Sequence, residues 1–239
     1  MPTPRYVRSM RIVALSASNN GDILMSNETS TPQVEFWRGD FGNSYTERNT
    51  ATHRQLAARV AMWSDILKPL VGKMPESILE VGCNLGINLR ALRALSPATL
   101  YAVEPNESAR AVLVRDNVLA QENLTDGFAQ SIKFPDRVAD LAFTSGVLIH
   151  IHPDNLLQAC EEIHRCSARY IACVEYFSDK PEMIPYRGHD DRLFKRDFGD
   201  FWMEHFPDLT VLATGFAWKR ITGLDNLTWW LFEKKNSAS

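Results

Sequence analysis

The chain has 239 residues, of which 45% are hydrophobic and 23% are charged, and this length is sufficient for a core that needs no disulfides or structural metals. Its formal net charge of −3 gives it no overall positive field for a nucleic acid or an anionic membrane. No apolar run approaches the roughly 20 residues that a membrane span requires. We therefore expect neither a nucleic-acid partner nor a membrane span.

The first part of the chain differs in composition from the rest. Three arginines precede a short apolar run, residues 12–15, which is too short for a secretory signal. A stretch rich in Ser, Asn and Thr follows over residues 16–32. We predict a disordered N-terminal extension over residues 1–33 and one domain over residues 34–239. An organellar presequence and a translation start at Met25 are the alternatives.

From residue 52 onward, helical and strand patterns alternate along the chain. The first helix, residues 52–70, has Leu56, Val60, Trp63 and Ile66 on one apolar face. Strands are then expected at 77–81, 100–103, a weak one between 124 and 132, 139–144, and 170–174. Helices are expected between them at 88–95, 107–119 and 154–166. This alternation is typical of βαβ units with a parallel sheet.

The C-terminal part departs from this alternation. Residues 210–213 and 228–232 both have strand patterns, and no full helix separates them. Two strands joined in this way are expected to pair antiparallel. We therefore predict an α/β fold, doubly wound and Rossmann-like, whose mostly parallel seven-stranded sheet carries a C-terminal antiparallel strand pair.

The four cysteines show no spacing that indicates chemistry. They form no CxxC pair, and no histidine lies at zinc-ligand spacing from two of them. We expect reduced, buried thiols, no bound metal and a cytoplasmic location. The cysteines are Cys83, Cys160, Cys166 and Cys173.

Residues 78–89, ILEVGCNLGINL, form a strand, a glycine-containing turn and the start of a helix. Gly82 and Gly86 permit a tight turn and the close approach of a ligand, because neither has a Cβ. A dinucleotide fingerprint would require glycines at 82, 84 and 87, but Asn84 and Ile87 stand at two of these positions. A P-loop is excluded too, because no Lys and Ser/Thr follow the second glycine.

This segment resembles the first motif of class I methyltransferases, acid-x-Gly-x-Gly-x-Gly. Glu80, Gly82 and Gly86 match it, and Asn84 replaces the middle glycine. The resemblance implies S-adenosylmethionine as the cofactor. Glu104 follows the second strand, where a carboxylate can accept both ribose hydroxyls of an adenosine. The expected cofactor-binding residues are Glu80, Gly82, Cys83, Asn84, Gly86, Asn88, Glu104, Pro105, Ser145, Tyr45 and Arg48.

Later segments follow in the order that methyltransferases show. They are the stretches 134–136, 140–141 and 144–150. The residue that holds the adenine amine is not evident between the third and fourth strands. Asp126 and Ser131 flank the position, and the choice between them stays open.

The flanking segments resemble the pseudaminic acid biosynthesis-associated methylases of bacterial surface-sugar gene clusters. The resemblance extends over about residues 34–235, and its stretches are FWRGDFGNSYTERN (36–49), TSGVLIHIHPD (144–154), VEYF (174–177), PYRGH (185–189), LFKRDF (193–198), GFAWKR (215–220) and TWWLFEK (228–234). It implies a small-molecule methyl acceptor, a sugar or nucleotide-sugar of the nonulosonate type.

A hydroxyl acceptor benefits from a general base within hydrogen-bond reach. His150 is the first candidate, because it follows the fourth strand at the open edge of the sheet and its type of side chain titrates near neutral pH. The alternative is a histidine that packs under the adenosine or caps the next helix. His152 and Glu175 are weaker candidates for the base.

Residues 186–196 are expected to recognise the acceptor, because arginine presents a planar fork to a carboxylate or phosphate. The candidates are Tyr186, Arg187, Lys195 and Arg196. Interleaved acids make a solvated, salt-bridged loop the alternative. Trp37, Tyr45 and Arg48 are candidates for a lid over the cofactor, with a helix-packing cluster as the alternative.

Two other functions are alternatives: a small-molecule or nucleic-acid N-methyltransferase, and a non-catalytic cofactor-binding scaffold. A base-modifying N-methyltransferase often carries an Asn/Asp-Pro-Pro-aromatic motif after the fourth strand, where residues 144–147 read TSGV. A non-catalytic cofactor-binding scaffold would keep the fold without the reaction. Binding of S-adenosylmethionine and formation of S-adenosylhomocysteine distinguish these possibilities.

Overall fold

The computed structural model describes residues 32–48, 52–188 and 192–235. Helix α1 (Pro32–Arg38) begins two residues before the expected domain boundary at residue 34. The rest of the expected N-terminal extension lies outside the described residues, as do Asp190 and Asp191 of the expected acceptor loop.

One seven-stranded sheet organises the described residues, in the order β3-β2-β1-β4-β5-β9-β8. The first five strands are parallel, and β9 is antiparallel to both of its neighbours. The strands are β1 (Ser77–Val81), β2 (Thr99–Val103), β3 (Leu124–Thr125), β4 (Ala139–Ser145), β5 (Ser167–Glu175), β8 (Leu209–Ala217) and β9 (Leu227–Lys234). The predicted doubly wound sheet with a C-terminal antiparallel pair is confirmed.

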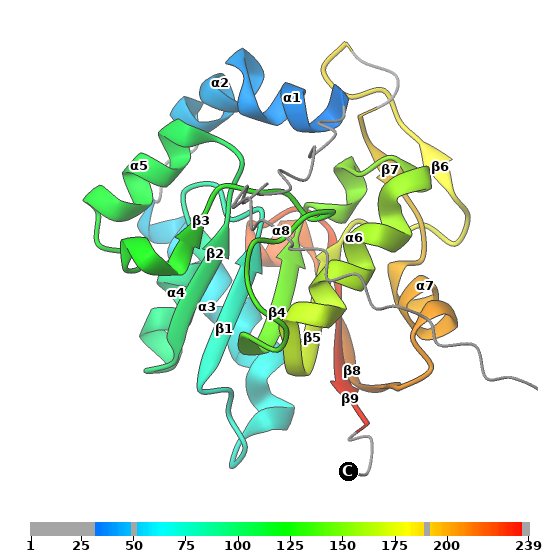
Figure 1. Cartoon of the computed structure of the whole chain (residues 1–239). Coiled ribbons are helices and arrows are strands. Elements are labelled where there is room, and N and C mark those ends of the chain that lie inside the picture. The colour runs from blue at the N-terminus through cyan, green and yellow to red at the C-terminus, as the bar shows by residue number, and fades with distance from the viewer. Residues whose placement is uncertain (1–31, 49–51, 189–191, 236–239) are drawn as a thin grey trace, which may run out of the picture.

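Helices cover both faces of this sheet (Figure 1). Alternate residues of each strand point to opposite faces, so Ile78 packs in one core and Leu79 in the other. The first core includes residues of α3 (His53–Leu67), α4 (Ile87–Leu95) and α5 (Glu107–Arg115). The second includes residues of α6 (Pro153–Cys166) and α7 (Phe198–His205).

Helices α1 and α2 (Asp40–Arg48) lie across the carboxyl end of the parallel strands, at the top of the view in Figure 1. Strands β6 (Glu182–Met183) and β7 (Phe194–Lys195) form a separate two-stranded antiparallel sheet. The remaining elements are α8 (Lys219–Thr222) and the 3-10 turns η1 (Lys68–Leu70), η2 (Gln121–Asn123) and η3 (Leu148–His150). We call helices α1 and α2 the lid.

Several expected boundaries were wrong. The helix expected over 107–119 ends at Arg115, because Asn117 adopts a left-handed φ of 52° that stops the helix. The third strand is only two residues long. Helix α7 was not expected from the sequence; its eight residues are too few to show a clear period, although Asp197 caps it by accepting from the N–H of Asp200.

No helix of the described part of the chain is long and apolar enough to cross a membrane. Within the same residues, no group of three or more His, Cys, Asp or Glu side chains is arranged to hold a metal ion. All four cysteines are buried and form no disulfide, as the sequence predicts.

Candidate active site

A cavity of about 210 Å³ lies where the carboxyl ends of β1, β2 and β4 meet beneath the lid. The chain leaves β1 for β2 and β3 on one side and returns to β4 on the other, so this is the switch point of the sheet, where open α/β folds bind ligands. The lid contributes Trp37 and Tyr45 to the lining, and α3 contributes Gln55 and Arg59.

The turn after β1 requires three residues with positive φ. Gly82 and Gly86 have φ values of 76° and 64°, and Asn84 has a φ of 46°. A Cβ on Gly82 would lie 2.7 Å from Cγ2 of Val147. Asparagine is one of the few residues that enter the left-handed region readily, which explains how Asn84 substitutes for the middle glycine of the motif.

The side chain of Asn84 also has a structural role that glycine cannot supply. Its Nδ2 donates to Oγ1 of Thr46 in the lid at 3.1 Å. Its backbone N–H donates to Oε2 of Glu104 at 2.7 Å. Asn84 therefore connects the turn both to the lid and to the carboxylate that follows β2.

Glu104 is buried and lines the cavity at the end of β2. Its Oε1 accepts from the backbone N–H of Asn106 at 2.9 Å. Burial raises the pKa of the Glu104 carboxyl to about 7, although the N–H groups of Asn106 and Asn84 favour the ionised form. The sequence placed this carboxylate correctly at a strand end, but its two backbone partners were not foreseen.

Glu80 points to the face of the sheet that carries α3 and α4. Its Oε1 accepts from Nδ2 of Asn88 at 2.8 Å, and Oδ1 of Asn88 accepts from Nε1 of Trp63 at 3.2 Å. Its Oε2 has no hydrogen-bond partner among the described residues, although it is buried. Burial raises the pKa of Glu80 to about 8. A buried carboxylate oxygen without a partner at a cavity wall indicates a site for a donor on a ligand.

Arg59 is a residue of this site that the sequence analysis missed. It lies on α3, lines the cavity and interacts electrostatically with Glu80 and Tyr45. Burial lowers the pKa of Arg59, and the Glu80 carboxylate acts in the opposite direction. Arg59 lies outside the apolar face by which the helix was recognised, and no motif surrounds it. The sequence therefore carried no signal for its position.

Neither Asp126 nor Ser131, between which the sequence left the choice open, lines the cavity. Asp126 instead accepts from Arg38 at 3.1 Å and from Arg110 at 3.2 Å. The cavity is lined at this position by the intervening residues Phe128, Ala129 and Gln130.

His150 lines the cavity at the end of η3. Its Nδ1 lies 2.6 Å from the carbonyl oxygen of Arg192. A carbonyl only accepts, so Nδ1 carries the proton and Nε2 carries the lone pair. Burial lowers the pKa of His150 to about 4, which keeps the ring neutral near pH 7. The rings of Trp37 and Tyr186 have their centroids 5.0 and 5.1 Å from that of His150.

The weaker candidates for the base have other roles. His152 lies at the N-cap of α6, where its Nδ1 accepts from the N–H of Asp154 at 3.3 Å. Glu175 is buried and does not line the cavity. Its Oε1 accepts from the N–H groups of Val147 and Leu148, both at 3.1 Å.

The remaining expected cofactor residues divide into two groups. Those that line the cavity are Cys83, Asn88, Pro105, Ser145 and Tyr45. Gly86 does not line it, and instead forms the N-cap of α4, where a Cβ would lie 2.6 Å from Cδ2 of Leu113. Arg48 does not line it either, and its guanidinium lies 5.9 Å from the centroid of the Phe41 ring.

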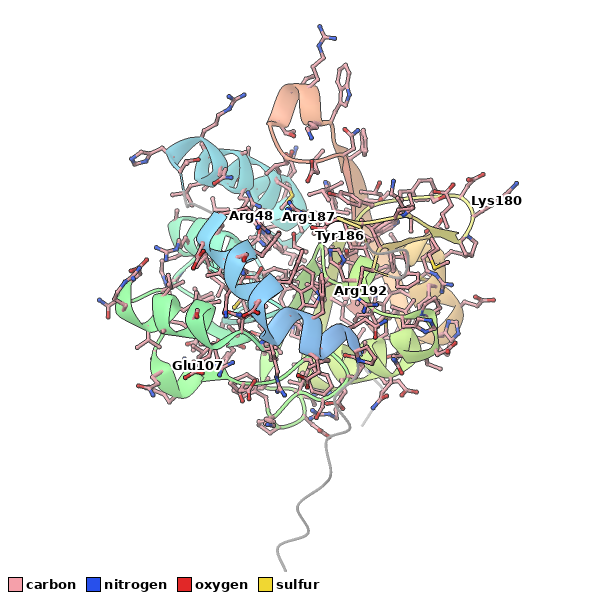
Figure 2. The ribbon with its side chains drawn as sticks, turned by 90° about the horizontal axis from the view of Figure 1, so that it is seen from above. Arg48, Glu107, Lys180, Tyr186, Arg187 and Arg192 are labelled. Atoms are coloured by element: carbon pink, nitrogen blue, oxygen red, sulfur yellow. The ribbon has the colours of Figure 1, made fainter. Side chains whose placement is uncertain are left out.

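None of the expected acceptor residues lines the cavity. Seen from above, Tyr186, Arg187 and Arg192 lie beside α1 and α2, whereas Lys180 lies at the outer edge of the molecule (Figure 2). Arg187 lies over the Tyr186 ring at 5.6 Å. Lys195 lines a second groove, and Arg196 packs over the ring of Phe201.

The architecture is similar to that of several solved structures. An S-adenosylmethionine-dependent methyltransferase of Leishmania major has a TM-score of 0.64 and 16% identity, over 85% of this chain and 87% of that one. A 1,6-didemethyltoxoflavin-N1-methyltransferase of Burkholderia thailandensis, solved with its substrate and S-adenosylhomocysteine, has a TM-score of 0.63 and 20% identity, over 83% and 87%. The [4+2]-cyclase SpnF has a TM-score of 0.53 and 12% identity, over 73% of this chain and 80% of that one.

These similarities establish the fold, which supports more than one reaction. No curated protein matches the sequence significantly. Residues 79–169, however, match the family model described as a methyltransferase domain. The chain is a methyltransferase. Its cofactor is S-adenosylmethionine, in keeping with the S-adenosylhomocysteine found in structures of this fold.

The matched segment begins inside β1 and ends inside β5. It therefore includes the turn after β1, Glu104 and His150, but not the lid or the C-terminal strand pair. The methyltransferase domain match covers the part of the chain in which the first-motif resemblance was identified. Arg59, Trp37 and Tyr45 join the cavity from outside that segment.

Proposed function

We propose that this methyltransferase transfers a methyl group from S-adenosylmethionine to a hydroxyl of a sugar or nucleotide-sugar of the nonulosonate type, with His150 as the general base. The observation that supports this most directly is the pairing, in one cavity, of a partnerless carboxylate oxygen on Glu80 with a neutral His150.

The cavity residues fit the parts of S-adenosylmethionine one by one. The partnerless Oε2 of Glu80 suits the α-ammonium of the methionine part, and Arg59 suits its carboxylate. Glu104 suits the ribose hydroxyls, because each of its oxygens retains acceptor capacity after one backbone bond. The segment Phe128–Gln130 would lie against the adenine. We propose these residues as the cofactor site.

The chain's own residues supply the rest of the reaction. When bound, S-adenosylmethionine provides a methyl group already activated on a sulfonium, so catalysis depends largely on positioning. Nε2 of His150 takes the proton of the acceptor hydroxyl while the oxygen forms its bond to the methyl carbon and the carbon–sulfur bond breaks. The products are a methyl ether, S-adenosylhomocysteine and one proton, which passes from His150 to solvent.

The proposed acceptor class rests on the family resemblance and on the surroundings of His150. Tyr186 lies against its ring and Arg187 lies over Tyr186, so an aromatic surface and a cation stand next to the base. A sugar acid can place an apolar ring face against Tyr186 and its carboxylate against Arg187. The Burkholderia thailandensis enzyme binds 1,6-didemethyltoxoflavin, which supports a small-molecule acceptor here.

Calorimetric titration with S-adenosylmethionine tests the cofactor site. We expect Glu104→Ala to weaken binding by about 1.5–3 kcal/mol, because a charged acceptor of ribose hydroxyls is lost. Glu107→Gln is the matched control, since Glu107 is exposed at the start of α5 and lies outside the cavity (Figure 2). Unchanged affinity in Glu104→Ala would remove Glu104 from the site.

Incubation with nonulosonate sugars and their nucleotide-activated forms tests the reaction. We expect S-adenosylhomocysteine to accumulate with a methylated sugar product, detected by mass spectrometry. Tight donor binding without product from any of these acceptors would refute the acceptor class while leaving the methyltransferase assignment in place.

A further inference from the structure

A second groove, of about 740 Å³, opens beside the cofactor cavity between β7 and the face of strands β8 and β9. This volume falls within the roughly 300–1,000 Å³ typical of small-molecule sites. Four aromatic side chains and two lysines line it, together with four polar or acidic side chains. The lining residues are Tyr176, Phe177, Phe216, Trp230, Lys195, Lys219, Thr214, Asp225, Asn226 and Thr228.

Two of the four aromatic rings of this groove are exposed to an unusual degree, whereas Trp230 is buried. Phe216 is 59% exposed and Phe177 is 47% exposed, although both are large apolar side chains. The rings of Phe177 and Trp230 lie 6.4 Å apart and tilted at 46°, so they form a corner. Exposed apolar rings grouped in a concave site indicate a surface for a flat aromatic ligand.

The charge of the groove favours an anion. Lys219 is paired with Asp225 at 3.0 Å, and the same carboxylate accepts from the hydroxyl of Tyr176 at 2.8 Å. Lys195 lies 5.6 Å from the centroid of the Tyr176 ring, and no carboxylate of the described residues lies within ion-pair distance of it. Two lysines against one aspartate leave the groove with a net positive charge at Lys195.

The groove adjoins the proposed reaction site. Asp225, on its wall, is close enough to Arg59 in the cofactor cavity to act on the charge of that guanidinium. Arg192, whose carbonyl contacts His150, and Lys195 are three residues apart, so their Cα atoms are separated by at most about 11 Å. Strand β7, which carries Lys195, also packs against η3, which ends at His150, so the groove and the base lie on neighbouring elements.

We propose that this groove binds the nucleotide part of a nucleotide-activated acceptor. The base stacks on the exposed rings of Phe216 and Phe177, and the phosphate adjoining the sugar contacts Lys195. The sugar then extends toward Nε2 of His150. This inference rests on the proposed function, because it names the class of acceptor for the same reaction.

Calorimetric titration of the full chain with each of the four ribonucleoside 5′-monophosphates tests the groove. The chain is first saturated with S-adenosylhomocysteine, so no methyl transfer can occur. We expect at least one monophosphate to bind, and its nucleoside and inorganic phosphate to bind about tenfold more weakly or worse, because stacking and charge act together. Binding of inorganic phosphate as tight as that of every nucleotide would overturn the proposal.

Two variants locate the site. We expect Lys195→Gln and Phe216→Ala each to weaken nucleotide binding about tenfold, since one removes the cation and the other a stacking ring. The matched controls are Lys180→Gln, on the outer edge of the molecule, and Val211→Ala, an exposed apolar residue of β8 outside the groove; both should bind as the parent does. Circular dichroism confirms that each variant is folded.

The outcomes separate this inference from the proposed function. Nucleotide binding that both groove variants leave unchanged, or no binding of any monophosphate up to millimolar concentrations, overturns the groove assignment. If the chain still binds S-adenosylhomocysteine in that experiment, the proposed cofactor site is retained although the groove assignment is rejected. Nucleotide binding that depends on Lys195 and Phe216, in a chain that does not bind the donor product, supports the groove and refutes the proposed cofactor site.

Discussion

At the residue scale, the carboxylate of Glu80 combines two features that rarely occur together. It is buried, and one of its oxygens has no hydrogen-bond partner among the described residues. Such a group costs free energy when it is ionised, which is why burial raises its pKa to about 8. A ligand ammonium at this oxygen would remove the cost by stabilising the ionised form.

This coupling predicts a proton release on cofactor binding. Near pH 7 the Glu80 carboxyl holds a proton that the bound ammonium displaces, so affinity for S-adenosylmethionine should rise from about pH 6 to about pH 7.5, by up to about tenfold per pH unit. Calorimetry in two buffers of different ionisation enthalpy counts the protons. Glu80→Gln should release fewer protons and show a flatter pH dependence, whereas Glu107→Gln should behave as the parent. Equal proton release in Glu80→Gln would contradict the assignment.

A second residue-scale prediction concerns His150. Because its Nδ1 is committed to the carbonyl of Arg192, its Nε2 is the acceptor, and His150→Ala should lower kcat by about 10²–10⁴-fold with little change in donor affinity. Burial lowers the His150 pKa to about 4, so protonation of this ring should not reduce turnover until the pH falls below about 5. Single-turnover kinetics measure the rate of methyl transfer in each variant and its dependence on pH. His152→Ala is the control, and an equal loss there would point to a structural effect.

At the element scale, polar contacts join the lid to the start of α5, beside the aromatic contacts of its own rings. Nδ2 of Asn106 donates to Oδ1 of Asn43 at 2.9 Å and to the carbonyl of Trp37 at 3.3 Å. Asn106 is also the N-cap of α5, where its Oδ1 accepts from the N–H of Ala109 at 2.9 Å. One side chain therefore serves a helix cap through its oxygen and the lid through its nitrogen.

These two roles can be separated by mutation. Asn106→Ser keeps a capping oxygen but loses both bonds to the lid, so its thermal stability should stay near that of the parent while the donor dissociates faster. Asn106→Ala loses the cap as well and should be less stable by about 1 kcal/mol. Stopped-flow displacement and thermal denaturation measure the two effects. Equal dissociation rates in the parent and Asn106→Ser would show that the lid does not retain the donor.

The sequence predicted elements whose signals are local. The strand before Gly82 and the carboxylate after β2 were identified because strand, turn and helix start follow within 12 residues of chain, 78–89, and because a strand-end acid is a local feature. The lid helices were not predicted as helices, since α1 and α2 are seven and nine residues long and pack through aromatic contacts such as Trp37 with Tyr45. Short helices depend on tertiary packing, which no local pattern contains.

The residues of the site also divide into those with a local signal in the sequence and those without one. Glu80 and Glu104 were found through their places in a motif, and the structure brings both to one cavity. Arg59 and the segment Phe128–Gln130 were not found, because only the fold brings α3 and the chain after β3 to the same point. The second groove brings together the segment after β5 and strands β7, β8 and β9, and no local pattern in the sequence indicates that these distant residues meet.

At the scale of the whole molecule, three buried carboxyl groups make stability depend on pH. Burial raises the pKa of Glu80 to about 8, and of Glu104 and Glu175 to about 7. Each pKa lies above the ordinary value of about 4.5 for a glutamate. Between about pH 4.5 and the raised pKa, the folded chain therefore holds more protons than the unfolded chain. Stability is therefore lost as the pH rises through the folded-state values. His150 and His164, with lowered pKa values, act in the opposite sense only below about pH 6.5.

We therefore expect the free energy of unfolding of the ligand-free protein to fall by at least about 1 kcal/mol between about pH 6.5 and about pH 8, because more than one carboxyl loses its proton in that range. Urea denaturation at the two pH values measures it, with an unchanged m-value as the check for two-state unfolding. Saturation with S-adenosylmethionine should reduce the difference. A ligand-free protein that grows more stable over this range would contradict the raised pKa values.

The two backbone bonds of Glu104 have a kinetic consequence. The N–H groups that this carboxylate accepts belong to Asn84 and Asn106, and the side-chain amides of the same two asparagines fasten the lid through Thr46 and Asn43. A ligand that fixes the charge on Glu104 therefore also fixes the positions of Asn84 and Asn106, which hold the lid. If an adenosine engages this carboxylate, it also orders the lid above the acceptor, so we expect the methyl donor to bind before the acceptor and its spent form to leave last.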